Sequence, residues 1–436
     1  MGQVMTILAL VALLFGIFLL LLFLNVPIYV CLGVSSLSTL LVAKMPLTMV
    51  PIILFSTTSR FTLLAIPFFI LAGLVMERAG ISGRLVALIV SLIGHVRGGL
   101  AMVTVVSCCL FGAISGSGPA TVAAIGLILI PAMTKGGYDR TFSTALAASS
   151  AEVAILIPPS IALVVYGVIS ETSVGELFMA GMIPGILISL SLLILAYWMS
   201  VRRGYGEARR QRKKLREVGI AFIDAFWGLL APVIILGGIY GGVFTPTEAA
   251  AVAAVYGIVV GVLIYRSLSF AALFKLLIDT AVASATIMVI VMSASVFAWI
   301  LTTGRVAQSV FSVMTAVTTN SVFVLMVLNM VLLVAGCFMD AISAYYIFIP
   351  LFLPLCKKLG VDPVHLGIIM TSNLAIGMIT PPVGVDLFTA CAISGVQFKD
   401  LCREIWPFVI ASIIPLILIT YIPAISLWLP IVLGMR

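Results

Sequence analysis

The chain has 436 residues, of which 63% are hydrophobic and 9% are charged, and its mean hydropathy is +1.32. This composition leaves too little polar surface for a soluble domain, so it excludes a soluble enzyme and indicates an integral protein of the lipid bilayer. The net charge is +8, and eight of the 23 Lys and Arg residues lie between 202 and 217. In so apolar a chain this basic run predicts a cytoplasmic loop rather than a nucleic-acid site.

Several apolar runs are long enough to cross a hydrocarbon core of about 30 Å, which takes about twenty helical residues. The first run is longer than the apolar region of a signal peptide and lacks a basic start and a cleavage motif, so we expect a retained helix. The clearest predicted crossings are 5–25, 174–199, 221–241, 278–303 and 405–429.

Each half of the chain has the same predicted order of elements. Two helices are followed by a short amphipathic piece, a third helix, a second amphipathic piece, a helical hairpin with a polar tip, a proline-broken helix and a closing helix. Amphipathic pieces at 81–96 and 268–276 are expected to lie along the membrane interface as arms. The predicted hairpins are 98–133 and 320–356, and the predicted broken helices are 138–171 and 362–394.

An internal repeat relates the two halves. Pro131 aligns with Pro354, and the pair Pro158 and Pro159 aligns with Pro381 and Pro382, at a constant offset of 223 residues. Prolines and glycines that recur at matching positions over about eighty residues are typical of an internally duplicated fold. We therefore predict a first repeat over 1–201, a basic cytoplasmic connector over 202–219 and a second repeat over 220–436.

The hairpins are either two short full crossings or re-entrant pairs whose tips stop near the bilayer midplane. With re-entrant pairs, each half crosses an odd number of times, so the second repeat is inverted and both termini lie outside. This topology leaves seventeen of the 23 basic residues inside, in agreement with the positive-inside rule. The predicted fold class is an all-α polytopic membrane protein with two inverted repeats.

The hairpin tips and helix breaks are the predicted functional points. Irregular backbone is tolerated at membrane depth only where protein or a water-filled cavity surrounds it, and paired elements of this kind form midplane sites in secondary transporters. Proline pairs release carbonyl groups that suit an alkali cation, and the helix N-termini that follow suit an anion. The candidate donors are Ser115, Ser117, Ser149, Ser150 and Ser160 in the first half, and Asp340, Ser343, Asn373 and Thr380 in the second.

Alternatives remain open for the carboxylates and the serines. Asp340 is either a functional intramembrane carboxylate or a hairpin cap among lipid headgroups. The serines either bind a ligand or serve only as small residues where neighbouring helices pack together. Glu152 and Asp386 either couple protons, shape an inward vestibule or have a water-exposed structural role.

Other function classes find little support. An intramembrane serine protease with Ser115 as nucleophile needs a histidine base, and the two histidines, His95 and His365, are expected far from it. The chain has no G-x-x-x-x-G-K-[ST] loop of an ATP-driven pump. Its seven cysteines form no C-x-x-C pair, which disfavours a metal or disulfide framework.

Five motifs together resemble the large membrane (M) subunit of tripartite ATP-independent periplasmic (TRAP) transporters, the DctM-like family. They are SGSGPA at 115–120, ILIPPS at 155–160, GGVFTPTEAAA at 241–251, GCFMD at 336–340 and ITPPVG at 379–384. The resemblance runs over essentially the whole chain. It implies a non-enzymatic permease of a bacterial or archaeal inner membrane that imports organic anions such as carboxylates or sialic acids with Na⁺. In that membrane, the topology inferred above places both termini in the periplasm.

The resemblance also implies a mechanism and partners. A transport domain that holds both hairpins and both broken helices would slide against a scaffold, as in an elevator. A periplasmic binding protein would deliver the substrate, and a small four-helix membrane subunit is expected as a separate chain. An autonomous sodium-coupled dicarboxylate or citrate carrier of similar fold is the alternative.

The expected ligands combine the motif positions with the donors named above, and Na⁺ is the only metal expected. The predicted sodium-binding residues are Ser115, Gly116, Ser117, Ser149, Pro158, Gly336, Asp340, Asn373, Thr380, Pro381 and Val383. The predicted substrate-binding residues are Ser117, Gly118, Pro119, Ser160, Ser343 and Gly384.

Overall fold

The computed structural model describes residues 2–206, 212–317 and 320–435, and these residues form 21 α-helices and three short 3-10 or π segments without a β-strand. Eight of the described helices are long and apolar enough to cross a membrane, and a bent pair raises the number to nine. The predicted all-α polytopic fold is confirmed.

The first half begins with α1 (Gly2–Phe23), α2 (Ile28–Val42), α3 (Met49–Thr58), η1 (Phe61–Leu64), α4 (Ala65–Arg78) and the arm α5 (Ile81–Ile93). The hairpin follows as α6 (Gly99–Ser115) and α7 (Gly118–Lys135), and the broken helix as α8 (Arg140–Ala151), η2 (Glu152–Ile155) and α9 (Ile161–Ser170). The closing helix is α10 (Val174–Arg202).

The second half begins with α11 (Leu215–Tyr240), α12 (Pro246–Val259), η3 (Val260–Ile264), α13 (Phe270–Thr303) and α14 (Val306–Val317). Its hairpin is α15 (Ser321–Phe338) and α16 (Ala341–Lys358), and its broken helix is α17 (Pro363–Met378) and α18 (Val385–Ser394). The chain closes with α19 (Phe398–Glu404), α20 (Trp406–Tyr421) and α21 (Pro423–Val432).

The predicted connector is only partly described. Its residues 207–211 lie outside the described residues, while 215–219 already belong to α11. The connector therefore ends earlier than the sequence suggested.

Two predicted segments differ from the structure. The arm expected at 268–276 is wrong, because α13 is one continuous helix of 34 residues with no internal proline or glycine to end it. The single crossing expected at 405–429 is also wrong. Pro423 follows Ile422, whose φ of −119° and ψ of 85° end α20 in the extended conformation that proline imposes on the residue before it.

The two halves share local geometry at corresponding positions. Gly137 and Gly360, before the broken helices, have φ values of +84° and +76°. Asp139 then caps α8 by accepting a hydrogen bond from the Phe142 N–H, and Asp362 caps α17 in the same way. Both proline pairs have cis peptide bonds.

Each hairpin touches its broken helix where glycine removes a side chain. A Cβ atom on Gly112 of α6 would lie 2.8 Å from Cα of Ala154 in η2. In the second half, a Cβ atom on Gly336 of α15 would lie 3.0 Å from Cα of Gly377 in α17. The backbones of hairpin and broken helix therefore approach within van der Waals contact in both halves.

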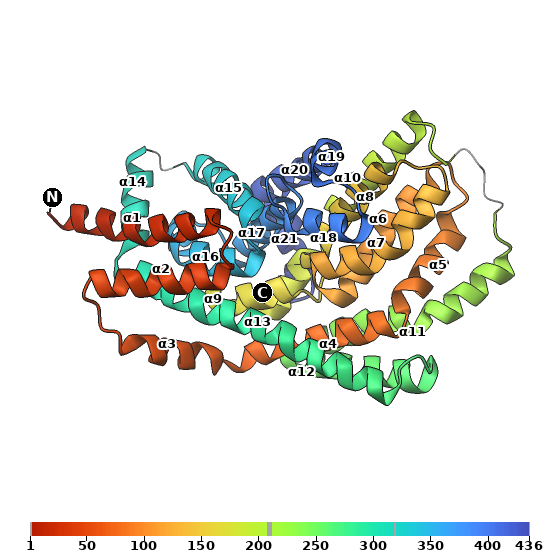
Figure 1. Cartoon of the computed structure of the whole chain (residues 1–436), viewed down its shortest axis with the longest axis horizontal. Coiled ribbons are helices and arrows are strands. Elements are labelled where there is room, and N and C mark those ends of the chain that lie inside the picture. The colour runs from red at the N-terminus through yellow and green to blue at the C-terminus, as the bar shows by residue number, and fades with distance from the viewer. Residues whose placement is uncertain (1, 207–211, 318–319, 436) are drawn as a thin grey trace.

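The helices form two groups, which meet where α13 packs on α16 and where α5 packs on α6. In the first group, α4 packs on α12, α2 packs on α1 and α13, and α11 packs on α5 and α12. The second group holds both hairpins, both broken helices, α10, α20 and α21, with α15 on α17 and α7 on α8 and α18. Figure 1 shows α3, α4, α12 and α13 along one edge of the molecule, with α15, α17, α18 and α20 on the other side. The two repeats thus interleave in both groups.

We expect Gly112→Ala to lower the free energy of unfolding by about 1–3 kcal/mol, because the added methyl group overpacks a backbone contact. The matched control is Gly237→Ala in α11, where a Cβ atom would meet nothing within 4 Å. The control should unfold at an unchanged or higher temperature, since alanine favours helix over glycine by up to about 1 kcal/mol. Thermal unfolding in detergent measures both variants, and equal midpoints would contradict the close contact.

Candidate ion and substrate site between two hairpin tips

The first hairpin tip is a tight turn between α6 and α7. Gly116 has a φ of +61°, and its N–H donates to the Gly112 carbonyl at 2.9 Å, which ends α6. The hydroxyl groups of Ser115 and Thr121 lie 2.7 Å apart and join the two arms of the hairpin. Ser117 occupies the position before α7 without capping it through its side chain.

This first tip lies directly on the first helix break. A Cβ atom on Gly116 would lie 2.7 Å from the Pro159 carbonyl oxygen, so only glycine fits there. Ser160 is buried, donates to the Ile155 carbonyl at 2.5 Å and accepts from the Leu163 N–H at 3.3 Å. Its hydroxyl group thereby joins the two ends of the break.

The second hairpin tip is held by Asp340. Its carboxylate accepts hydrogen bonds from the N–H groups of Ile342 at 2.9 Å and Ser343 at 3.2 Å, and from the Ser343 hydroxyl at 2.6 Å. Asp340 is half-buried. Asp340 therefore caps the N-terminus of α16, and Ser343 donates two of the hydrogen bonds that hold its carboxylate.

A backbone hydrogen bond joins the second tip to the second break. The Gly384 N–H donates to the Cys337 carbonyl at 3.0 Å, and Gly384 has a φ of +60°. At the end of α17, the Thr380 hydroxyl donates to the Ile376 carbonyl at 2.6 Å. Hairpin tip and helix break are thus in contact in both halves of the chain.

Both tips and both breaks border one cavity of about 230 Å³. The first residues of α7, α9, α16 and α18 lie on its wall, so four helix N-termini meet there, and two isoleucines of α13 complete it. Among the residues that the structure describes, no Lys, Arg or His lines it. The lining residues are Gly116, Ser117, Gly118, Pro119, Ile155, Ile161, Ala162, Ile287, Ile290, Asp340, Ala341, Ile342, Met378 and Val385.

Not every predicted ligand lines this cavity. Ser149 and Ser150 donate back to the Leu146 carbonyl of their own helix. The amide nitrogen of Asn373 donates to the Asn329 side chain at 2.7 Å, while its buried amide oxygen has no hydrogen-bond partner. The predicted residues that border the cavity itself are Gly116, Ser117, Gly118, Pro119 and Asp340. Ser115, Pro158, Ser160, Gly336, Ser343, Thr380, Pro381, Val383 and Gly384 belong to the tips and breaks around it.

Sequence reasoning missed Thr121 and most of the apolar wall of the cavity, which includes Ile287 and Ile290. Thr121 forms a hydrogen bond with Ser115, and this contact between the two arms of the hairpin cannot be read from the sequence alone. Ile287 and Ile290 of α13 look like ordinary lipid-facing side chains in the sequence.

The water-exposed role considered for Glu152 and Asp386 is wrong, because both side chains are fully buried, with 0% exposure. They pack within the group of hairpins and broken helices, since η2 contacts α6, α7 and α17, and α18 contacts α7 and α8.

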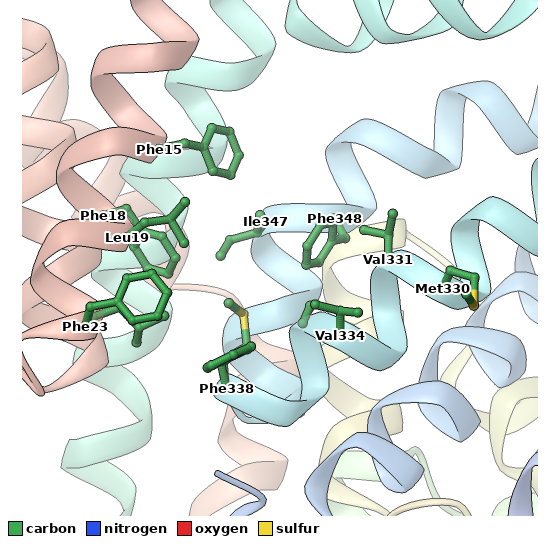
Figure 2. A pocket seen from close by; sticks show the side chains of 13 residues that line it. Phe15, Phe18, Leu19, Phe23, Met330, Val331, Val334, Phe338, Ile347 and Phe348 are labelled. Carbon is green, nitrogen blue, oxygen red and sulfur yellow. The ribbon is translucent and has the colours of Figure 1, made fainter. Parts of the chain in front are cut away.

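A larger cavity of about 550 Å³ lies between α1 and the second hairpin. Figure 2 shows Phe15, Phe18 and Phe23 on one side of it, and Val334 and Phe348 on the other. Its lining side chains are all apolar, so it offers no polar group to an ion or an organic anion. The smaller cavity between the tips is therefore the candidate site.

Comparison with known proteins identifies the family. The model of the DctM component of the tripartite ATP-independent periplasmic transporter matches residues 15–425. The chain belongs to this DctM family of TRAP transporters. The resemblance seen in the sequence is thereby confirmed, and the relatives found are transporter permeases.

Relatives in the DctM family are named for different substrates. The chain is 45% identical to the C4-dicarboxylate TRAP transporter large permease protein DctM of Pseudomonas aeruginosa, over 93% of this chain and 94% of that protein. It is 43% identical to the isethionate TRAP transporter permease protein DctMQ of Oleidesulfovibrio alaskensis, over 95% of this chain but only 65% of that protein. The sialic acid large permease SiaM of Vibrio cholerae is 36% identical, over 85% of this chain and 86% of that one.

A solved structure shares the fold. The YdaH transporter of Alcanivorax borkumensis, described as having an unusual topology, matches with a TM-score of 0.59, 15% sequence identity and coverage of 84% of this chain and 86% of that chain. At this identity the likeness concerns the fold alone.

We expect Gly116→Ala to abolish transport by this DctM-family protein, because the added methyl group collides with the Pro159 carbonyl and separates tip from break. The matched control is Gly137→Ala, which has the same left-handed backbone at φ +84° but nothing within 4 Å of the added atom. Both variants carry a conformational cost of about 1–2 kcal/mol. Only Gly116→Ala should stop uptake in proteoliposomes, and equal uptake by the two variants would reject the tip contact as functional.

Proposed function

We propose that this chain is the permease of a sodium-coupled secondary transporter that imports a small organic anion into the cell across the inner membrane. The observation that carries the proposal is the convergence of four helix N-termini, those of α7, α9, α16 and α18, on one cavity between the hairpin tips. Helix N-termini present unpaired N–H groups and a partial positive charge, and they bind anions without a basic side chain.

The helix ends differ in how their N–H groups are used. In α16 the Asp340 carboxylate takes the first free N–H groups, and in α9 the Ser160 hydroxyl takes one. Helices α7 and α18 have no side-chain cap. The N-termini of α7 and α18 are therefore the ones we assign to the carboxylate or sulfonate group of the substrate.

Sodium ions would bind beside the cavity, at the two contacts between tip and break. Backbone carbonyls at Pro159 and Cys337, hydroxyl groups at Ser115 and Thr380, and the Asp340 carboxylate are hard oxygen donors of the kind that alkali cations prefer. A bound cation next to each uncapped helix end would reinforce the attraction for an anion. This coupling explains how an anion is recognised in a cavity that has no basic side chain in its wall.

The relatives narrow the substrate class. The substrates in their names include C4-dicarboxylate, isethionate and sialic acid, each of which carries a carboxylate or sulfonate group. We propose a substrate of this chemistry for the present chain. A cavity of about 230 Å³ suits a compact anion of few heavy atoms.

We further propose that the protein works with partners and as an elevator. The relative named DctMQ is longer than this chain, which covers 65% of it, so a second component is proposed here as a separate small membrane subunit. A periplasmic binding protein would deliver substrate, as the family description suggests. The group of hairpins and broken helices would move as one body against the group built on α4, α12 and α13.

We expect Asp340→Asn to raise the sodium concentration for half-maximal uptake by at least about tenfold, equivalent to about 1.4 kcal/mol. The change removes a negative charge at the cavity while an amide oxygen can still cap α16. The measurement is sodium-dependent uptake in proteoliposomes that contain the partner subunits.

The matched control for this variant is Asp362→Asn, which alters the same kind of cap on α17 away from the cavity. An unchanged sodium dependence of Asp340→Asn, or an equal shift in both variants, would remove Asp340 from the sodium site. Full uptake without any binding protein would instead favour an autonomous carrier.

The orientation is tested by a cysteine in the basic connector. Lys214→Cys lies just before α11, and we expect an impermeant maleimide to label it only from the cytoplasmic side, because basic loops stay inside. The labelling assay uses intact cells and inverted vesicles of a background in which the native cysteines are replaced. Labelling in intact cells would reverse the proposed topology.

A further inference from the structure

Two buried carboxylates outside the cavity wall have no role in the function proposed so far. Glu152 lies at the start of η2, before the first break, and Asp386 lies in the first turn of α18, after the second break. Both are fully buried, and both carboxylates retain oxygen atoms without a hydrogen-bond partner. For Asp386 these are both oxygen atoms, and for Glu152 it is Oε2.

The described residues around Asp386 supply neither a hydrogen bond to its carboxylate nor a salt bridge. Its carboxylate lies at the first tip, where a Cβ atom on Gly118 would meet Oδ2 at 2.7 Å and Oδ1 at 2.9 Å. The missing side chain of Gly118 makes the space that the carboxylate fills. Asp386 is also an electrostatic neighbour of Glu152 and of the Cys108 thiol on α6.

In the described part of the chain, the Glu152 side chain has one hydrogen-bond partner. Its Oε1 atom accepts a hydrogen bond from the Ser412 hydroxyl of α20 at 2.5 Å. The charged side chains on the packed helices are at helix ends, with Lys135 closing α7 and Arg140 opening α8. In the part of the chain that the structure describes, neither Glu152 nor Asp386 forms a salt bridge.

Two ionised carboxylates in such surroundings would be very unfavourable. An unpaired charge in a low-dielectric interior costs several kcal/mol or more, and the usual outcome is neutralisation by a proton. A sodium ion would need several oxygen ligands around it, as hard cations do, whereas the space beside Gly118 is already filled by the Asp386 carboxylate. A proton needs no coordination shell, so it fits this site better than a metal ion does.

The position of the pair ties its protonation to the hairpin. At the tip, the N-terminus of α7 stabilises a negative charge on Asp386 when water reaches it. In the arrangement described here, burial without a hydrogen bond favours the acid. A rearrangement that brings water to the first tip would hydrate the carboxylate and release the proton to the aqueous compartment that the site then faces.

We propose that Glu152 and Asp386 form a proton-binding site, so that this permease carries protons together with its substrate and sodium. Binding forms one O–H bond on a carboxylate oxygen with a proton from water on the loading side, and release breaks that bond on the other side. This inference rests on the proposed transport function, and its test has one arm that needs no transport.

The first arm reads protonation directly. An infrared spectrum of the purified chain should contain a carboxylic-acid C=O band at neutral pH, and Asp386→Asn or Glu152→Gln should remove intensity from it. The control Asp400→Asn alters an exposed carboxylate on neighbouring α19 and should leave the band unchanged. A spectrum without an acid band at neutral pH would overturn the inference, whether or not the protein transports.

The second arm measures proton movement. The complete complex in proteoliposomes is supplied with a sodium gradient and a C4-dicarboxylate, isethionate or sialic acid, and an internal pH dye reports acidification at clamped membrane potential. We expect substrate-dependent acidification that falls to background in Asp386→Asn and persists in Asp400→Asn.

The outcomes separate the two proposals. Uptake without acidification would overturn proton transport and leave the sodium-coupled function intact. A large change of sodium affinity in Asp386→Asn, with acidification retained, would make the site a sodium site and contradict the inference. If the unmodified complex takes up none of these anions in a sodium-dependent manner, the proposed function fails, and proton co-transport fails with it.

Discussion

The close approach of each hairpin to its broken helix is the constraint on which the site depends. Irregular backbone within a membrane protein has to be enclosed by protein, since lipid offers no hydrogen bonds to free N–H and C=O groups. Here the enclosure is achieved by removing side chains at Gly112, Gly116 and Gly336, where a Cβ atom would collide with the opposing segment. Because two backbones are in contact at each point, carbonyl and amide groups from both become available to one small cavity.

The internal repeat made most of this architecture predictable from the sequence. Prolines and glycines at matched spacing fix where helices stop, so both hairpins and both broken helices were expected close to their observed bounds. Asp340 was singled out in the sequence, and in the structure it caps α16 and also borders the cavity. Its role as a functional carboxylate stays a prediction. Local signals of this kind act within a few residues and therefore leave a clear trace in the chain.

What the sequence left out depends on contacts between distant segments. The pairing of Ser115 with Thr121, the isoleucines of α13 in the cavity wall and the burial of Asp386 against Gly118 all follow from packing across the fold. A carboxylate near a proline pair looks the same in sequence whether it faces water or the interior. The arm predicted at 268–276 was wrong because of a local signal. Charge in an apolar stretch suggested a separate interfacial piece, but no residue there ends the helix.

The unbroken course of α13 has a consequence for the membrane itself. At about 1.5 Å per residue, its 34 residues extend for about 50 Å, well beyond a hydrocarbon core of about 30 Å. A helix of this length has to tilt, protrude into the headgroup layer or thicken the lipid around it. Since α13 also contacts α16 of the second hairpin and supplies part of the cavity wall, a tilt of α13 would change the angle of one face of the candidate site. We therefore expect the geometry of this site to respond to the thickness of the surrounding bilayer.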